Sequence, residues 1–345
     1  MSTALITGGA GFIGSNVAHR LATEGCRVRI LDNLSRSGVG SNLAWLGHSH
    51  GNLIDFQMGD VRDPACVRRA MRGVDRVFHF AAQVAVTTSL ENPSEDISVN
   101  VNGTFNVLEE ARATARPPAV VFTSTNKVYG GLDHVELEER EGRYEPLRSD
   151  LRASGIGEDQ PLQFRTPYGC SKGAADQYVL DWSRSYGIPA VVMRMSCIYG
   201  PRQFGTEDQG WVAHFLIRAL TGLSLTVYGD GNQVRDLLFI DDLVDAMTTV
   251  SRQAELLAGR ALNIGGGPVN AVSLNQVIDL IQELCGHRPA VRRSPWRSGD
   301  QRYYVTDHST LTDLLGWRPR VNVHEGLALL RDWLLEHRVQ SFIAA

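Results

Sequence analysis

One stretch decides the fold: Gly8-Gly9-Ala10-Gly11-Phe12-Ile13-Gly14. It follows a short apolar run at residues 4–7 and opens a helical pattern at residues 13–23, so it joins a predicted strand to a predicted helix. Glycines at such a junction allow a tight turn and a close approach of phosphate to the backbone, and a helix N-terminus attracts negative charge. The motif predicts the pyrophosphate-binding turn of a dinucleotide site, and a tight turn without a ligand is the alternative.

Apolar runs alternate with helical patterns along the first 194 residues. The runs at 4–7, 28–31, 53–58, 74–80, 119–124 and 190–194 are typical of buried parallel strands. Helical patterns lie between them at 13–23, 64–71, 99–114 and 168–186. This order predicts an α/β fold with a Rossmann-type, doubly wound parallel sheet, in which ligands bind at the carboxyl ends of the strands.

Residues 195–345 have a less regular pattern and more glycine, and they predict a smaller C-terminal α/β domain that binds substrate. Helical patterns occur there at 211–221, 242–252, 273–284 and 323–336, and some of these segments can return to the first domain. The polar stretch 133–165 is predicted to be a long surface loop or lid.

Composition excludes several classes of protein. Hydrophobic residues make up 43% of the chain and charged residues 21%, so a buried core is expected rather than disorder. A net charge of −4 offers no basic surface for nucleic acid, and no apolar run reaches the roughly 20 residues that span a membrane. Five scattered cysteines and the lack of a signal peptide pattern favour the cytoplasm. His48 and His50 stand alone in a predicted polar loop, so no metal site is expected.

Acidic residues follow the second and third predicted strands. Asp32 can accept hydrogen bonds from the adenosine ribose, and its charge repels the 2′-phosphate of NADP, which favours NAD. Arg36 lies nearby and leaves NADP as the alternative. Asp60 and Val61 are placed to contact the adenine.

Tyr168 and Lys172 form a second signal. Their i, i+4 spacing on a helix puts the phenol and the ammonium on one face. A nearby ammonium and a positive nicotinamide ring would both lower the tyrosine pKa, so that the phenolate could take a proton from a sugar hydroxyl. Thr125, at the end of the fifth predicted strand, can share a hydrogen bond with that hydroxyl. The alternatives are an exposed helix pair and a strand-end threonine bonded to local backbone.

Together these motifs resemble the extended short-chain dehydrogenase/reductase family, which modifies nucleotide sugars, over essentially the whole chain. The resemblance is sharpest to its CDP-paratose 2-epimerase (CDP-tyvelose epimerase) branch. The stretches that carry it are Asp32-Asn-Leu-Ser-Arg36, Ser124-Thr-Asn-Lys-Val-Tyr-Gly130, Pro167-Tyr-Gly-Cys-Ser-Lys-Gly-Ala-Ala-Asp-Gln-Tyr178, Arg202-Gln-Phe204, Asp208-Gln-Gly-Trp211 and Gln233-Val-Arg-Asp236. Met195 departs from the histidine of that branch, which leaves the sugar open.

The resemblance implies tightly held NAD, a homodimer or higher homo-oligomer formed through residues 99–114 and 168–186, and a catalytic set of Thr125, Tyr168 and Lys172. It also implies that carbon 2 of the sugar is oxidised to a ketone and receives hydride on its other face. Arg235 and Arg302 resemble the family's clamp for the nucleotide diphosphate, and Thr226 and Tyr228 are expected to contact the base.

The expected contacts form two sets. Those to the cofactor are Gly8, Gly11, Phe12, Ile13, Gly14, Asp32, Asn33, Ser35, Arg36, Asp60, Val61, Ala81, Ala82, Gln83, Asn100, Ser124, Tyr168 and Lys172. Those to the substrate are Thr88, Thr125, Asn126, Arg202, Gln209, Thr226, Tyr228, Arg235 and Arg302.

The sequence thus predicts an NAD-dependent epimerase that inverts carbon 2 of a CDP-linked hexose. A 4-epimerase of a UDP-linked sugar is the nearest alternative. Dehydration ranks lower, because 4,6-dehydratases carry an Asp-Glu pair where this chain has Asn126 and Lys127, and an amide and an ammonium cannot perform that pair's proton transfers. A non-enzymatic NAD sensor would have no use for Thr125, Tyr168 and Lys172 together.

Overall fold

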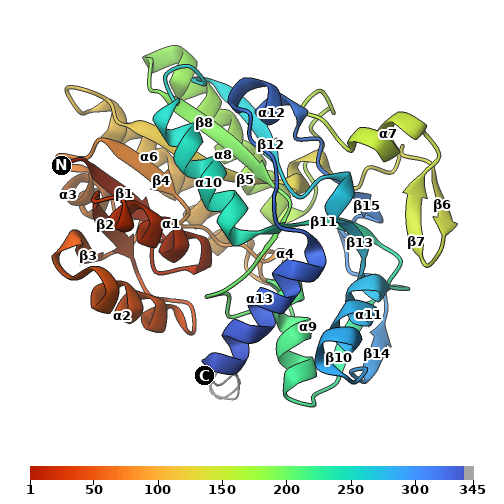
Figure 1. Ribbon diagram of the computed structural model, residues 1–345. Helices are drawn as coiled ribbons and strands as arrows, with labels where there is room; N and C mark the ends of the chain where they lie inside the picture. Colours follow the sequence, from red (N-terminus) through yellow and green to blue (C-terminus); the bar gives the residue numbers. More distant parts are fainter. Residues whose placement is uncertain (338–345) are drawn as a thin grey trace. The chain divides into compact units, whose positions relative to one another are not determined.

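The computed structural model describes residues 1–337, and the chain divides into two units (Figure 1). The first unit comprises Met1–Val128, Thr166–Arg194 and Val244–Leu262. The second comprises Tyr129–Arg165, Met195–Leu243 and the described chain from Asn263 onward. The expected boundary between residues 194 and 195 coincides with one of these junctions. Two segments belong to the other unit than this boundary alone would give: Tyr129–Arg165 lies in the second unit and Val244–Leu262 in the first.

A seven-stranded sheet forms the centre of the first unit, in the order β12-β8-β5-β4-β1-β2-β3. Its strands are β1 (Thr3–Thr7), β2 (Arg27–Asp32), β3 (Ile54–Met58), β4 (Arg76–His79), β5 (Ala119–Thr125), β8 (Ala190–Met195) and β12 (Arg260–Ile264). The pairs β1·β2, β2·β3, β1·β4 and β4·β5 are parallel. Chain order reverses between β1 and β4, and ligands of doubly wound sheets bind at such a switch point. The predicted Rossmann-type sheet is confirmed.

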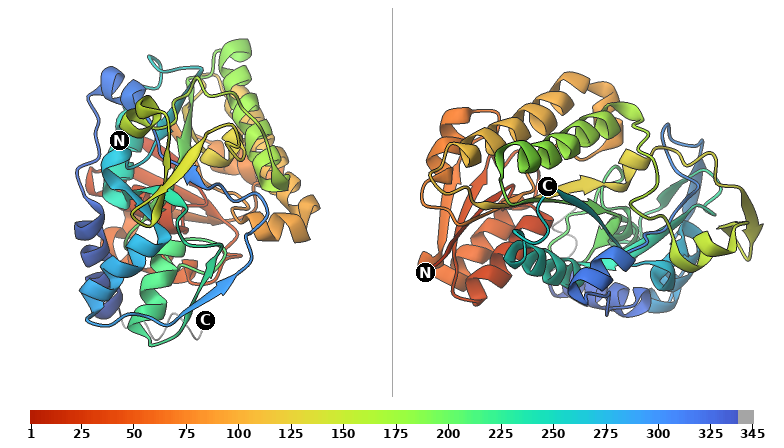
Figure 2. Two further views of the ribbon diagram at one scale, coloured as in Figure 1. Left: turned by 90° about the vertical axis from the view of Figure 1, so that its right-hand side faces the viewer. Right: turned by 90° about the horizontal axis from the view of Figure 1, so that it is seen from above.

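Helices cover both faces of this sheet, as the right-hand view of Figure 2 shows. One face carries α1 (Phe12–Thr23), α2 (Val39–His50) and α10 (Ile240–Arg252). The other carries α3 (Pro64–Met71), α6 (Gly103–Arg112) and α8 (Thr166–Tyr186), and α4 (Val86–Glu91), α5 (Pro93–Ile97) and a π-helical turn, η2 (Ser98–Asn102), precede α6. Strands and helices meet in a core of fully buried aliphatic side chains, because both faces of the sheet exclude water.

In its described part the second unit contains short strands and five complete α-helices. Its four-stranded sheet joins β9 (Cys197–Tyr199), β11 (Val234–Phe239), β13 (Ala271–Ser273) and β15 (Tyr303–Tyr304), and β10 (Leu225–Tyr228) pairs with β14 (Val291–Ser294). The helices are α7 (Ser149–Ser154), α9 (Trp211–Leu220), α11 (Leu274–Cys285), α12 (Ser309–Leu315) and α13 (Val323–Glu336). The helices predicted at 211–221, 273–284 and 323–336 are confirmed, and Ser273 begins α11 with a capping box completed by Gln276.

Two sequence-based expectations are wrong. The stretch 133–165 is not a structureless loop, since it contains a hairpin of β6 (Leu137–Arg140) and β7 (Arg143–Pro146), followed by α7. His48 and His50 lie in helix α2 rather than in a loop. Glycines at positions 38, 40 and 47 mask the helical pattern of α2, but buried Val39 and Leu46 hold the helix against its neighbours through packing.

Candidate active site

The glycine turn between β1 and α1 leaves no room for side chains. Gly8 has φ +70°, and a Cβ there would lie 2.7 Å from the backbone nitrogen of Ala81. A Cβ on Gly14 would collide with the carbonyl oxygen of Gly8. Gly11 is the N-cap of α1 and provides no side-chain cap, so the helix start presents backbone N–H groups to a ligand. The turn therefore fits a pyrophosphate on the N-terminus of α1.

Carboxylates order the loops that follow β2 and β3. Asp32 accepts hydrogen bonds from the backbone N–H groups of Ala10 (3.0 Å) and Leu34 (2.8 Å). Asn33 donates to Asp60 across the two loops at 2.9 Å. Hydrogen bonds from Arg62 are the main reason that the pKa of Asp60 falls to about 2. These hydrogen bonds order the two loops at which adenosine was predicted to bind.

The other predicted adenosine contacts belong to the same two loops. The backbone N–H of Ser35 is held by Asn33, and Val61 is buried, with its carbonyl accepting from Asn106 at 2.9 Å. The charge of Arg36 interacts with Tyr168 and with Asp32, so this side chain lies within electrostatic range of both the predicted ribose ligand and the predicted catalytic phenol.

Asn100 fixes the loop that follows β4. Its Oδ1 accepts from the backbone N–H of Gln83 at 2.9 Å, and its Nδ2 lies 3.1 Å from the Gln83 carbonyl and 3.0 Å from the Ser171 hydroxyl. Ala81 and Ala82 begin this loop, and Ala81 donates to the Thr7 hydroxyl. Asn100 lies in η2, and such π-helical turns concentrate at functional sites. Asn100 thus joins the loop at the switch point to helix α8, which carries Tyr168 and Lys172.

The three predicted catalytic side chains are brought together in the first unit. Thr125 ends β5, and Tyr168 and Lys172 lie on the face of α8 that packs on this strand. All three are buried, and the Thr125 hydroxyl acts on Tyr168 in the direction that favours the phenolate. Lys172 donates from Nζ to the carbonyl of Thr123 at 2.5 Å and stands 4.3 Å from the centre of the Phe122 ring.

Burial gives Tyr168 a higher pKa than Lys172, which reverses the usual order of these two groups. Desolvation raises the pKa of Tyr168 to about 12, although the Thr125 hydrogen bond and the charge of Arg36 oppose the rise. Desolvation likewise lowers the pKa of Lys172 to about 7. The lowered tyrosine pKa expected from the sequence is therefore not a property of the protein alone, because burial outweighs neighbouring positive charge and the Lys172 ammonium points to a β5 carbonyl.

Two buried hydroxyls near this set have no hydrogen-bond partner within residues 1–337. They belong to Ser124, on β5, and to Thr87, on α4. Ser124 was predicted to contact the cofactor, and its orphaned oxygen fits a ligand at that position. Thr88, predicted to contact substrate, is exposed on α4, whereas the sequence analysis missed its neighbour Thr87. Asn126 is buried, and its Oδ1 accepts from Thr125 at 3.4 Å.

The predicted diphosphate clamp lies in the second unit, where β11 and β15 run side by side. Arg235 is buried, and its guanidinium donates to Asp300 Oδ1 at 2.7 Å and to the Gln301 carbonyl at 2.6 Å. Its charge is thus committed to neighbouring protein groups. Arg302 is exposed, and its guanidinium stands 5.7 Å from each of the Tyr144 and Trp296 rings. Arg302 is therefore the more accessible of the two cations.

The remaining predicted substrate contacts also lie in the second unit. Tyr228 and Thr226 are on β10, and the Tyr228 hydroxyl donates to Glu207 at 2.5 Å while Arg297 stacks on its ring at 3.8 Å. Gln209 exchanges backbone hydrogen bonds with Thr206 in a turn. Arg202 has a positive φ of 74° and stands 5.6 Å from the Trp333 ring.

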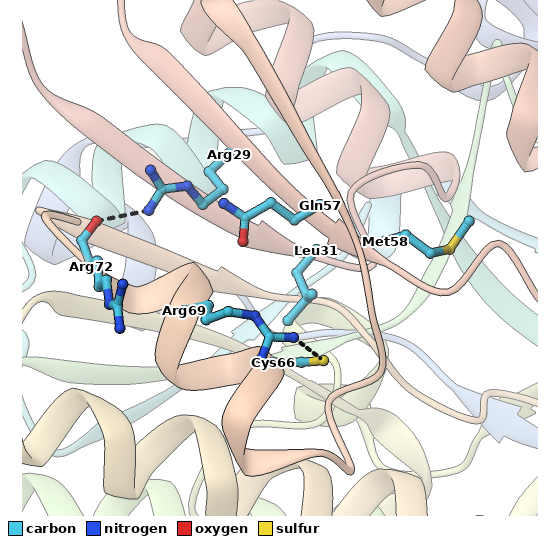
Figure 3. Close-up of a pocket in the computed structure, with 7 residues that line it drawn as sticks. All are labelled: Arg29, Leu31, Gln57, Met58, Cys66, Arg69 and Arg72. Atoms are coloured by element: carbon cyan, nitrogen blue, oxygen red, sulfur yellow. Dashed lines mark hydrogen bonds between the residues drawn. The ribbon is translucent and has the colours of Figure 1, made fainter.

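A hollow of about 430 Å³ opens at the edge of the first unit's sheet (Figure 3). Residues of β2, β3 and α3 line it, together with the residue that follows α3: Arg29, Leu31, Gln57, Met58, Cys66, Arg69 and Arg72. Arg29 is held there by Asp55 at 2.8 Å and by the Arg72 carbonyl at 2.7 Å. None of the predicted site residues lines this hollow.

Sequence reasoning missed Asp96 and Ser171, whose side chains both meet the amide of Asn100. Asp96 Oδ1 is 3.2 Å from Asn100 Nδ2, and Ser171 shares the same amide. The spacing of Asp96 and Asn100, four residues apart, could have indicated a shared helix face.

Two features are absent from the part of the chain that the structure describes. Among residues 1–337, no helix has the length and apolar character needed to cross a membrane. Nor does any group of three or more histidine, cysteine, aspartate or glutamate side chains in that range have a metal-binding arrangement.

Comparison with known proteins gives a consistent match. Residues 4–265 match the NAD dependent epimerase/dehydratase family. The chain is 41% identical to the CDP-paratose 2-epimerase of Salmonella typhi, over 95% of this chain and 98% of that protein. It is 34% identical to a dTDP-glucose 4,6-dehydratase of Xanthomonas campestris, over 98% and 94%. The Thermus thermophilus UDP-glucose 4-epimerase in complex with NAD matches at 32% identity, with a TM-score of 0.80 over 96% and 99% of the two chains.

Proposed function

Because the chain belongs to the NAD dependent epimerase/dehydratase family, we propose that it is an NAD-dependent epimerase that inverts carbon 2 of a CDP-linked hexose. The observation that carries this proposal is the buried set of Thr125, Tyr168 and Lys172 on β5 and α8, in the same unit as the glycine turn. The 41% identity to a CDP-paratose 2-epimerase supports the nucleotide and the position of inversion.

The residues of the first unit fit NAD. The glycine turn and the start of α1 would hold the pyrophosphate, Asp32 the ribose, and Asn100 orders the loop that follows β4. The buried Ser124 hydroxyl, with no partner in the described chain, is a further contact. Bound NAD supplies the acceptor and donor of hydride, and a positive ring charge that favours the phenolate.

Tyr168 acts as base and then as acid. Its phenolate would take the proton of the sugar's 2-hydroxyl as carbon 2 becomes a ketone, with bound NAD supplying the hydride acceptor. Once the ketone has turned over to present its other face, the phenol would give the proton back to the oxygen, with the same cofactor supplying the hydride. Thr125 steers that hydroxyl, and the Lys172 charge favours the phenolate. No net oxidation or reduction of the sugar results.

A 4-epimerase of a UDP-linked sugar is the second candidate, supported by the match to the Thermus thermophilus UDP-glucose 4-epimerase. Dehydration is disfavoured despite the 34% identity to a 4,6-dehydratase, since Asn126 and Lys127 lack a carboxyl acid and base.

CDP-linked hexoses are expected to raise the melting temperature more than UDP-, dTDP- or GDP-linked ones, because a ligand that binds only the native state stabilises it. The ligand that raises it most is then incubated with the holoenzyme in heavy water, and NMR locates the inverted carbon. We expect inversion at carbon 2 without solvent deuterium there, since the hydrogen returns from the cofactor. Inversion at carbon 4 of a UDP-sugar would establish the second candidate, and deuterium at the inverted carbon would contradict hydride return.

We also propose a homodimer formed through α6 and α8. These helices pack together and carry aromatic side chains that are unusually exposed: Phe105 (42%), Tyr178 (42%) and Tyr186 (48%), which surround Trp182. An exposed apolar patch of this kind is typical of a protein interface. The nucleotide-sugar substrate and the reduced cysteines favour a cytoplasmic enzyme.

Replacing both Phe105 and Tyr178 by glutamate is expected to give a monomer in sedimentation analysis, because two buried negative charges would oppose association. The matched control replaces exposed Leu256 and Val269, which lie outside both helices, by glutamate. A dimer that survives the first change would contradict this interface.

A further inference from the structure

The hollow at the edge of the first unit's sheet is lined by side chains that the proposed reaction does not use (Figure 3). Leu31 and Gln57 are register partners in β2 and β3, so both side chains lie on the face of the sheet that carries α3. Side chains alternate across a strand, and Asp32, the next residue in β2, meets the glycine turn at Ala10. The sheet therefore lies between the hollow and the glycine turn.

Arg29 is held in the hollow as one half of an ion pair. Its Nε donates to Asp55 Oδ2 at 2.8 Å, and its Nη1 donates to the carbonyls of Ala70 and Arg72 at 2.9 and 2.7 Å. The side chain is only 14% exposed, so these bonds fix the guanidinium in one position. Among residues 1–337 its Nη2 makes no hydrogen bond, which leaves a preorganised donor for a ligand.

Arg69 and Arg72 add two charges that no salt bridge neutralises in the described part of the chain. Arg69 Nη2 donates to the Cys66 sulfur at 2.9 Å, and the guanidinium of Arg72 makes no hydrogen bond within residues 1–337. Asp63 acts on Arg69 electrostatically, but this carboxylate is exposed, and its oxygens accept from the Ala65 N–H and the Cys66 thiol. Positive charge is therefore in excess in the hollow.

Leu31 and Met58 give the hollow an apolar part. Leu31 is 1% exposed, whereas Met58 is 61% exposed, which is unusually open for a large apolar side chain. A methionine can adapt its flexible thioether to the shape of an apolar ligand. The volume of about 430 Å³ falls within the roughly 300–1,000 Å³ of small-molecule sites, which combine apolar walls with a few polar groups.

The balance of charge selects the class of ligand. The ion pair of Arg29 and Asp55 is neutral as a whole, so Arg69 and Arg72 supply two positive charges. A phosphate monoester carries close to two negative charges at neutral pH and has three free oxygens, and guanidinium forks match such oxygens. A carboxylate has a single charge and two oxygens, so it complements the hollow less well.

We propose that this hollow binds a phosphate monoester with an apolar body, at a site apart from the proposed active site. Arg69, Arg72 and the Nη2 of Arg29 bind the phosphate, and Leu31 and Met58 contact the body of the ligand. The proposal does not rest on the proposed function, because none of these side chains belongs to the predicted catalytic, cofactor or substrate sets.

Cys66 can report whether the hollow is occupied, because its thiol lines the hollow beside Arg69. The holoenzyme is treated with iodoacetamide, a neutral alkylating reagent, at increasing concentrations of phenyl phosphate. Peptide mass spectrometry then gives the alkylation rate of each cysteine. Phenyl phosphate is expected to slow the alkylation of Cys66 and to leave that of Cys285 unchanged, which is also half-buried but lies in the second unit. Phosphate that binds elsewhere in the protein does not cover Cys66.

Arg72→Gln is expected to raise the concentration of phenyl phosphate that gives half-protection of Cys66 by about tenfold, because a charge-assisted hydrogen-bonding fork is lost. Arg72→Lys keeps the charge without the fork and should lie between this variant and the unchanged protein. The matched control is Arg116→Gln, which removes the same charge from an exposed position between α6 and β5, outside the hollow. The half-protection concentration does not depend on the intrinsic reactivity of the thiol, so the variants can be compared directly.

Three further probes separate the parts of the ligand. Phenol lacks the phosphate and should not protect Cys66, whereas inorganic phosphate lacks the apolar body and benzoate has a single charge, so both should protect only at higher concentrations. Equal protection by benzoate or by inorganic phosphate would overturn the assignment to a phosphate monoester. No protection by phenyl phosphate, or protection that is unchanged in Arg72→Gln, would overturn the site itself. Because the test does not measure turnover, a protein that epimerises no nucleotide sugar would give the same result.

Discussion

Tyr168→Phe is expected to lower kcat about 10³-fold, the usual contribution of a positioned acid and base. The change removes only the phenol oxygen, which is the atom that takes the proton and gives it back. The ring stays buried beside Thr125, so the fold loses no more than one hydrogen bond, worth about 1 kcal/mol.

Two measurements separate chemistry from binding in this variant. Turnover of the nucleotide sugar is followed at saturating substrate, and the NAD released on denaturation is quantified. Tyr178→Phe is the matched control, because Tyr178 lies on the same helix and is 42% exposed. Full turnover by Tyr168→Phe would refute the mechanism, whereas loss of NAD would show that the phenol holds the cofactor rather than the proton.

Local signals in the sequence were sufficient to predict the glycine turn and the shared helix face of Tyr168 and Lys172. Gly8 and Gly14 are required by backbone geometry that a short motif encodes, and Tyr168 and Lys172 share a helix face through their spacing. The alternating apolar runs gave the sheet, because strands buried on both faces leave continuous apolar stretches.

What the sequence missed depends on tertiary contacts. Asp96 looks like one of several acids between residues 91 and 96, and only folding buries it against Asn100 and beside α8. The raised pKa of Tyr168 is likewise a consequence of burial that no local pattern records. Arg235 resembled a phosphate ligand by its position, yet the structure commits its guanidinium to Asp300.

The largest effect on stability is expected at the buried pair of Asp176 and Arg194, which ties α8 to β8. In Arg194→Met the Asp176 carboxylate is left without its partner at 0% exposure, and breaking such a pair typically costs about 3–5 kcal/mol of the free energy of unfolding. Urea unfolding measures the loss. The control is Arg112→Met, because the Arg112–Glu109 pair is partly exposed and is expected to cost under about 1 kcal/mol.

The double variant Asp176→Leu/Arg194→Met tests whether the stability lost in Arg194→Met comes from the unpaired charge of Asp176 or from lost packing of the Arg194 side chain. It should be more stable than Arg194→Met, because an apolar pair leaves no uncompensated charge behind. Lys172 adds a second readout, since Asp176 lies one helical turn beyond it and acts on its charge. Once Arg194 no longer neutralises Asp176 in Arg194→Met, the pKa of Lys172 should rise. An NMR titration of ε-¹³C-labelled lysine in a Lys127→Arg background measures it, because Lys172 is then the only lysine in the sequence. A stability loss no greater than that of Arg112→Met, with an unmoved Lys172 midpoint, would mean that the pair contributes neither to stability nor to the electrostatics of the active site.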